Sequence, residues 1–259
     1  VVLAASRGDA LGRLTQDKPK SMIPIQGEPL LATLVRYHHE AGIQNVYVVV
    51  GYKPEAVTVT GIKKIHNPDY ADTKELYSLY QARHVLNGPA VVSFGDVIFK
   101  RYILQNLLSE TGDIVIVADG EMSRHRRSDS YRDLLHCTKA RSNAYLDEPV
   151  YLERIDPHLD RQEAHGEWIG LMRLSANGAM AVCGALEALQ LRDDFAELRM
   201  KDLFDYLLRD RHRIRVVYVR GHWLDVDDLE AALTAANIIH EFHSYDGAGH
   251  GFQDFVSKD

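Results

Sequence analysis

The chain has 259 residues, 46% of them hydrophobic and 26% charged, values typical of a globular protein with one large or two smaller domains. A formal net charge of −7 and a pI near 6.0 argue against nucleic acid as the main partner. No apolar run reaches the roughly 20 residues that a membrane helix needs, so we expect no transmembrane segment and no membrane partner.

Two features of the sequence concern the compartment of the protein and the extent of its chain. Cys137 and Cys183 lie far apart without CxxC spacing, which predicts unpaired thiols in a reducing cytoplasm. The chain also begins without Met, inside its first strand pattern, so we expect a domain taken from a longer chain.

The first half of the chain alternates strand and helix patterns. Val1–Ala4 predicts a strand, and Pro29–Ala41 carries apolar residues at helical spacing, with Gly42 at the expected helix stop. The apolar run Val46–Val50 is typical of a buried parallel strand. The pattern continues with a helix over Lys74–Leu86, a strand over Ala90–Phe94, a helix over Arg101–Leu108 and a strand over Asp113–Ala118.

The alternation stops between Glu121 and Arg141. This polar stretch is rich in basic residues: Arg124, His125, Arg126, Arg127, Arg132, Lys139 and Arg141. The later segments are predicted strands over Val150–Ile155, Trp168–Leu174 and Ile214–Val219, and predicted helices over Ala176–Leu189, Glu197–Arg209 and Leu229–Phe242.

These patterns predict an α/β fold. We expect one domain over 1–259, with a doubly wound, mostly parallel mixed sheet and helices on both faces. A small substrate-binding insertion is expected over about 120–170, and a tail over about 244–259. Such folds bind ligands beyond the carboxyl ends of their strands.

The segment after the first strand has the composition of a phosphate-binding loop. The strand ends in a small, glycine-containing turn at Ser6–Gly8, where backbone N–H groups can surround a phosphate. Lys20, which follows Pro19, adds a positive charge beside that turn. The loop therefore predicts a binding site for a polyphosphate.

Three carboxylates are candidates for a magnesium site. Asp96 directly follows one strand, and Asp225 and Asp227 follow another and precede the last predicted helix. If both strand ends face the loop, the oxygen ligands that Mg²⁺ prefers meet beside the phosphates. The alternative is structural, with Asp227 and Asp228 at the start of the last helix and Asp96 capping the helix after it.

The combination of motifs resembles the nucleotidyltransferase family. It consists of Leu-Ala-Ala-small-x-Gly, Thr15, Pro19-Lys20, Phe-Gly-Asp near position 95 and Trp-x-Asp-x-Asp near position 225, in that order. The resemblance implies a Rossmann variant like that of the nucleotide-diphospho-sugar transferases, with Mg²⁺ as cofactor. It also implies that the nucleotide is bound by Leu3, Ala4, Ala5, Ser6, Gly8, Lys20 and Gly95.

A narrower resemblance rests on Ala-Ala-Ser-Arg-Gly at the start, Val-Gly-Tyr-Lys at 50–53, the run 93–104 and Asp-Ile-Val-Ile-Val at 113–117. These segments are similar to the cytidylyltransferase domain joined to phosphoenolpyruvate phosphomutase in phosphonate biosynthesis of the fosfomycin type. The resemblance implies transfer of CMP from CTP to a small phosphonate such as 2-hydroxyethylphosphonate, with release of pyrophosphate. It also implies an upstream mutase domain in the same chain.

The loop departs from the broad family pattern at one position. Alignment on Gly8 and Leu11 places Ala10 where the family has arginine. Arg7 or Arg13 can supply that charge from a neighbouring position, and we take Lys20 and Arg7 as the candidate catalytic residues.

Candidate acceptor-binding residues lie on several segments: Lys53, Glu75, Ser78, Glu167 and Trp168. Helix capping is the alternative for Glu75 and Ser78, and a place in the core is the alternative for Trp168. The basic stretch from Arg124 to Arg141 is a further candidate for binding a phosphonate, with a solvated surface loop as its alternative.

Two other functions fit the same motifs. The first is a nucleotidyltransferase acting on phosphocholine or a sugar 1-phosphate. The second is a regulatory nucleotide-binding module without catalysis, which Ala10 favours and the intact Lys20 and carboxylates argue against. The sequence leaves open whether the chain forms a homo-oligomer.

Overall fold

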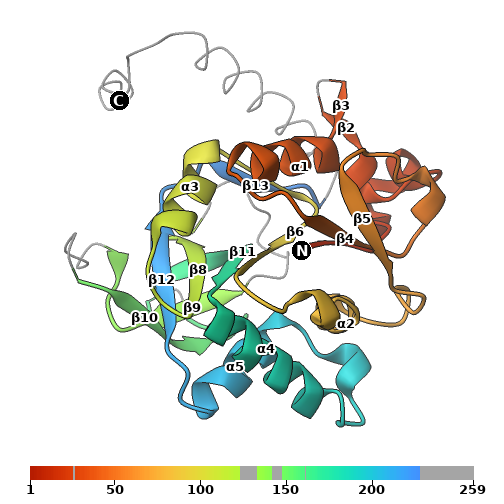
Figure 1. The fold of residues 1–259 in the computed structure, drawn as a ribbon. Coiled ribbons are helices and arrows are strands. Elements are labelled where there is room, and N and C mark those ends of the chain that lie inside the picture. The colour runs from red at the N-terminus through yellow and green to blue at the C-terminus, as the bar shows by residue number, and fades with distance from the viewer. Residues whose placement is uncertain (26, 123–132, 142–147, 161, 228–259) are drawn as a thin grey trace, which may run out of the picture.

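A mixed sheet forms the centre of the molecule. The computed structural model describes residues 1–259 except 26, 123–132, 142–147, 161 and 228–259, and within that part nine strands form the main sheet (Figure 1). Their spatial order is β5 (Ile62–His66), β4 (Val46–Val50), β1 (Val2–Ala4), β6 (Ala90–Phe94), β11 (Gly166–Leu174), β8 (Ile114–Asp119), β12 (Ile214–Val219), β10 (Val150–Ile155) and β9 (Leu134–Cys137).

The strands of the main sheet run in both directions. β5, β4, β1 and β6 pair in parallel, as do β8 and β12, and β11 runs antiparallel between β6 and β8. Beyond β12, β10 and β9 pair antiparallel, and β9 also pairs with β11. The sheet is thus mixed, as expected, with β11 as the reversed strand at its centre.

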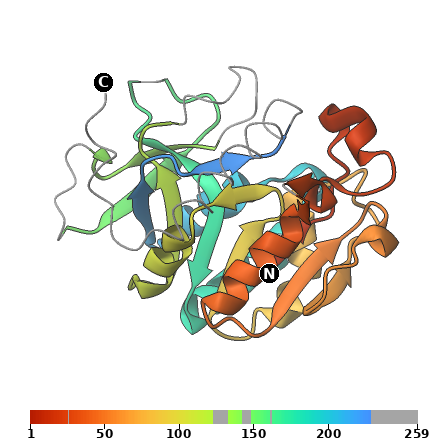
Figure 2. The same cartoon turned by 90° about the horizontal axis from the view of Figure 1, so that it is seen from above.

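Helices cover both faces of this sheet. One face carries α1 (Leu30–Glu40) and α3 (Arg101–Ser109), which lie in front of the strands in the view from above (Figure 2). The other face carries α2 (Glu75–Gln81), α4 (Ala176–Leu189) and α5 (Met200–Arg209) (Figure 1).

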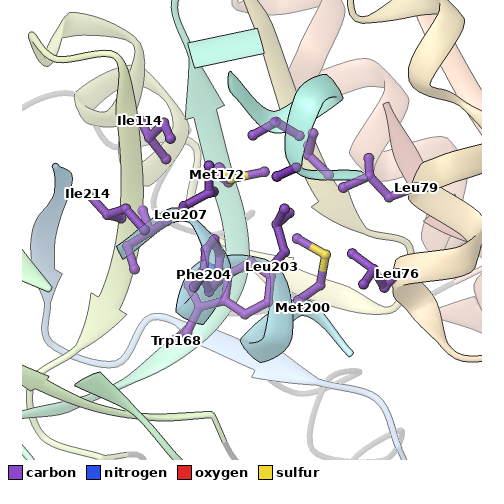
Figure 3. Packing of buried hydrophobic residues seen from close by; sticks show 14 of the residues in the cluster. Leu76, Leu79, Ile114, Trp168, Met172, Met200, Leu203, Phe204, Leu207 and Ile214 are labelled. Atoms are coloured by element: carbon purple, nitrogen blue, oxygen red, sulfur yellow. The ribbon is translucent and has the colours of Figure 1, made fainter. Parts of the chain in front are cut away.

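Strand side chains alternate between the two layers, as the two-residue period of a strand requires. In β1, Val2 and Ala4 face the α1 layer, while Leu3 and Ala5 after it face the α2 layer. Trp168 packs edge-on against Phe204 of α5, with ring centroids 5.1 Å apart (Figure 3). Each layer therefore has its own buried core, and the sheet separates the two.

The expected strands at 46–50, 90–94, 150–155 and 214–219 have the predicted bounds. The helix expected over Lys74–Leu86 is wrong in length, since α2 stops at Gln81 and a 3₁₀ turn follows over Arg83–Val85. The helix expected from Glu197 starts three residues later because Phe195–Glu197 form a separate 3₁₀ turn. The expected helix over 229–242 and the tail lie outside the described residues.

The segment expected as an insertion is built into the main sheet. Its described residues supply β9, β10 and β11, and β11 is a central strand that pairs with both β6 and β8. Among the helices of the described residues, none has the length and apolar character needed to cross a bilayer.

Candidate active site

The loop after β1 is shaped by Gly8 and holds Lys20 in place. Gly8 has φ +80°, in the left-handed region, and a β-carbon on it would lie 2.8 Å from Lys20 Cβ. The backbone N–H of Lys20 donates to Arg7 O at 3.0 Å, and buried Thr15 donates from its hydroxyl to Gly8 O at 3.0 Å. The loop therefore folds back on itself and presents Lys20 beside the end of β1.

A short two-stranded ribbon brings the distant carboxylates together. β7 (Val97–Phe99) pairs antiparallel with β13 (Trp223–Asp225), so that Asp225 lies opposite Val97. The N–H of Val226 donates to Asp96 O at 3.0 Å, which continues this pairing. From the sequence, the two late aspartates are expected to follow the strand that is now β12; the structure places Asp225 at the end of β13 and Asp227 two residues beyond it.

Lys20 lies among these carboxylates. Its Nζ forms an ion pair with Asp96 and lies 3.2 Å from Asp227 Oδ1. Burial acts to lower the pKa of Lys20, but the charges of Asp96, Asp225 and Asp227 outweigh burial and raise that pKa above its usual range. Lys20 is therefore a fixed positive charge at any physiological pH.

The carboxylates fit a small divalent cation. One oxygen each from Asp96, Asp225 and Asp227 lies within 4.8 Å of the other two. The Oδ1 atom of Asp96 is buried and has no hydrogen-bond partner among the described residues. Carboxylate oxygens are the ligands that Mg²⁺ prefers, so the donor set suits the expected ion.

The carboxylates and Lys20 are among the residues that line a cavity of about 340 Å³. Its walls come from the end of β1, the start of α2, the middle of β11 and the β7–β13 ribbon. The lining residues are Leu3, Ala5, Ser6, Lys20, Tyr70, Thr73, Lys74, Glu75, Ser78, Phe94, Asp96, Asp133, Trp168, Ile169, Gly170, Arg199, Trp223, Asp225 and Asp227.

Four of the residues expected to bind the nucleotide line this cavity: Leu3, Ala5, Ser6 and Lys20. Ala4 faces the opposite layer, toward α1. Gly95 allows close contact between strands, because a β-carbon there would lie 2.6 Å from Ala4 Cβ and 3.0 Å from Leu3 O. Gly8 acts indirectly, by leaving space for Lys20.

Arg7, the second expected catalytic residue, does not line the cavity. Its guanidinium lies 5.5 Å from the centre of the Tyr52 ring and 3.3 Å from Asp9. Arg13 is exposed. Of the two arginines considered as replacements at the Ala10 position, Arg7 is thus the one held by contacts with its surroundings.

The structure places some of the residues expected to bind the acceptor in the cavity lining and others outside it. Glu75, Ser78 and Trp168 line the cavity. Lys53 does not; its Nζ lies 5.8 Å from the centre of the Tyr52 ring. Glu167 is fully buried and is not among the lining residues.

Most of the basic stretch, including Arg124, His125, Arg126, Arg127 and Arg132, lies outside the described residues. Its two described cations are engaged away from the cavity lining. Lys139 forms an ion pair with Glu148, and Arg141 lies 4.0 Å from Glu121.

Sequence reasoning missed several lining residues: Tyr70, Thr73, Lys74, Asp133, Arg199 and Trp223. Lys74 and Arg199 were the ones that a charge pattern could have revealed, because each is a cation within the first three residues of a predicted helix. Their approach to each other depends on α2 and α5 meeting in space, which the sequence does not show.

Two relatives show what the chain is similar to. It is 26% identical to choline-phosphate cytidylyltransferase of Streptococcus pneumoniae over 182 residues, which cover 66% of this chain and 79% of that protein. It is 37% identical to CMP-5'-(3-aminopropyl)phosphonate synthase of Streptomyces rubellomurinus over 116 residues, or 41% of this chain. That second match spans only 18% of the Streptomyces protein.

The solved structures share the fold. CTP:phosphocholine cytidylyltransferase of Streptococcus pneumoniae aligns over 92% of this chain and 97% of its own length, with a TM-score of 0.70 at 18% identity. The expected nucleotide-diphospho-sugar transferase fold is thereby confirmed. The MobA-like NTP transferase domain matches residues 1–189, well over half of the sequence, and the chain belongs to that family.

Proposed function

We propose that this chain transfers CMP from CTP to a small phosphonate and releases pyrophosphate. The observation that carries the proposal is Lys20, which lies among three carboxylates beside the loop after β1 and with them lines a cavity of about 340 Å³. A family of NTP transferases and two relatives named for cytidylyl chemistry support this assignment.

The proposed reaction needs no general base. A phosphonate oxygen, already anionic near neutral pH, attacks the α-phosphorus of CTP and forms the new P–O bond. The bond from the α-phosphorus to the bridging oxygen breaks, and pyrophosphate leaves with that electron pair. The protein must therefore bring two anions together and neutralise their charge, as in other phosphoryl transfers.

The residues of this chain serve that purpose. Lys20 supplies a permanent positive charge, and Ser6 belongs to the turn that lies beside it in the cavity wall. Asp96, Asp225 and Asp227 would hold Mg²⁺, which when bound neutralises phosphate charge. Trp168 and Phe94 close part of the cavity with apolar surface and so restrict water.

A second candidate acceptor is phosphocholine or a sugar 1-phosphate. The relative named for choline-phosphate matches 66% of the chain, more than the 41% matched by the phosphonate enzyme.

An upstream phosphomutase domain and a homo-oligomeric state stay predictions.

The test is a pyrophosphate-release assay that crosses the four NTPs with 2-hydroxyethylphosphonate, aminoethylphosphonate, phosphocholine and a sugar 1-phosphate. Activity with CTP and a phosphonate, lost with EDTA and restored by Mg²⁺, supports the proposal. Activity with phosphocholine or a sugar phosphate alone supports the second candidate. Nucleotide binding without turnover for any pair would support the non-catalytic module.

A further inference from the structure

The cavity lining carries further cations besides Lys20. The described lining residues include three cations, Lys20, Lys74 and Arg199. Lys20 is engaged by Asp96, Asp225 and Asp227. Lys74 and Arg199 lie at the N-terminal ends of α2 and α5, each is about one-third exposed, and Lys74 Nζ lies 3.5 Å from Glu197 Oε2.

Two hydrogen bonds fix the two helix starts against each other. The N–H of Lys74 donates to Ala196 O at 3.0 Å, and the N–H of Met200 donates to Glu75 Oε1 at 3.0 Å. The N–H of Arg199 in turn donates to Asp202 Oδ2 at 2.7 Å. The backbones that carry both cations are therefore held in place before any ligand binds.

Glu75 also reaches the side chain of Arg199. Its Oε2 lies 3.5 Å from the guanidinium, while its other oxygen accepts from Met200. Glu75 was expected to bind the acceptor directly, but these contacts make it the residue that orients Arg199. A planar guanidinium so oriented is well suited to the oxygens of a phosphorus oxyanion.

We infer that Arg199, oriented by Glu75 and assisted by Lys74, binds the phosphorus oxyanion of the acceptor. The inference rests on the proposed function, in which Lys20 and the loop after β1 take the nucleotide phosphates. A second acidic ligand then needs its own cations, and Arg199 and Lys74 are the other cations among the described lining residues.

The test measures KM for CTP and KM for the acceptor separately, in Arg199→Gln, Arg199→Lys, Lys74→Gln and Glu75→Gln. Arg199→Gln should raise the acceptor KM about tenfold or more, because a charge-assisted hydrogen bond contributes about 1.5–3 kcal/mol. Arg199→Lys and Lys74→Gln should raise it less, and all three should leave the CTP KM within about twofold of wild type. Arg209→Gln, in the exposed last turn of α5, is the matched control and should change neither constant.

Glu75→Gln keeps an oxygen for the Met200 N–H and removes the charge facing Arg199. A positioning role predicts a higher acceptor KM with kcat little changed and with an unaltered thermal unfolding midpoint. If Arg199→Gln does not fold, Arg199→Lys and Lys74→Gln carry the test.

Three results would overturn the inference: a rise in the CTP KM alone, no change in either KM, or better use of phosphocholine with unchanged use of 2-hydroxyethylphosphonate. The last result would place Arg199 beside the end of the acceptor that lies opposite its phosphorus oxyanion. A wild-type protein that releases no pyrophosphate with any pair would refute the proposed function instead.

Discussion

Lys20 and Asp96 form a buried ion pair between the loop after β1 and the end of β6, with side chains only 17% and 10% exposed. The ion pair joins the loop after β1 to the carboxylate cluster. The backbone carbonyl of Asp96 also accepts a hydrogen bond from the N–H of Val226, the residue that follows β13. Through these two contacts, Asp96 connects the loop after β1, the end of β6 and the β7–β13 ribbon, which the proposed reaction needs together.

Replacement of Lys20 by alanine should lower kcat by about 10²–10³, because a preorganised positive group beside the phosphates is lost. Pyrophosphate release measures this effect, and circular dichroism checks that the fold is retained. Lys63→Ala is the matched control, since Lys63 is exposed on β5 and donates to Asn45 at 3.0 Å. Turnover near that of wild type in Lys20→Ala would exclude a catalytic role.

The Lys20–Asp96 ion pair should also contribute to the free energy of unfolding. Asp96→Asn leaves Lys20 charged beside a neutral partner, and breaking a buried pair in this way typically costs about 3–5 kcal/mol. Because Asp225 and Asp227 also attract Lys20, we expect a loss toward the lower end of that range. The double variant Lys20→Met/Asp96→Asn should be more stable than Asp96→Asn alone in urea unfolding. If the stability losses of the single variants Lys20→Met and Asp96→Asn add up to the loss of the double variant, the pair contributes no coupling energy.

The elements that the sequence predicted well share one property. Strands such as Val46–Val50 and Ala90–Phe94 consist mainly of apolar residues, because both of their faces are largely buried, and such runs have clear ends. The helices α1 and α3 likewise have one apolar stripe each. Their local pattern alone was sufficient to place them.

The missed elements depend on contacts between distant segments. β7 and β13 have three residues each, too few for a recognisable period, and they form strands because they pair with each other. The structure brings the three expected carboxylates together, and their geometry depends on that ribbon. Arg199 was missed because its position in the cavity requires the contact of α5 with Glu75.

The close contact between β1 and β6 predicts a strict need for glycine at position 95. A β-carbon on Gly95 would lie 2.6 Å from Ala4 Cβ, so Gly95→Ala should push the end of β6 away from β1 and cost about 1–3 kcal/mol. Asp96 would move with it, so kcat should also fall. Gly88→Ala is the control, because a β-carbon at Gly88 meets nothing within 4 Å among the described residues. Equal stability of the two variants in urea unfolding would contradict this account.

The histidine at position 38 predicts how stability depends on pH. His38 is buried in α1, where its Nδ1 lies 2.7 Å from Leu34 O, and burial lowers its pKa from 6.5 to about 4. Below pH 6.5 the unfolded chain binds a proton that the folded chain does not, so stability should decline as the pH falls from 6.5 to 4. The shift corresponds to about 3 kcal/mol by the time the pH reaches the folded pKa. His38→Asn keeps a donor for Leu34 and should flatten this slope in urea unfolding measured at a series of pH values, whereas the exposed His84→Asn should leave the slope unchanged. An equal slope in wild type and His38→Asn would assign the acid sensitivity to other groups.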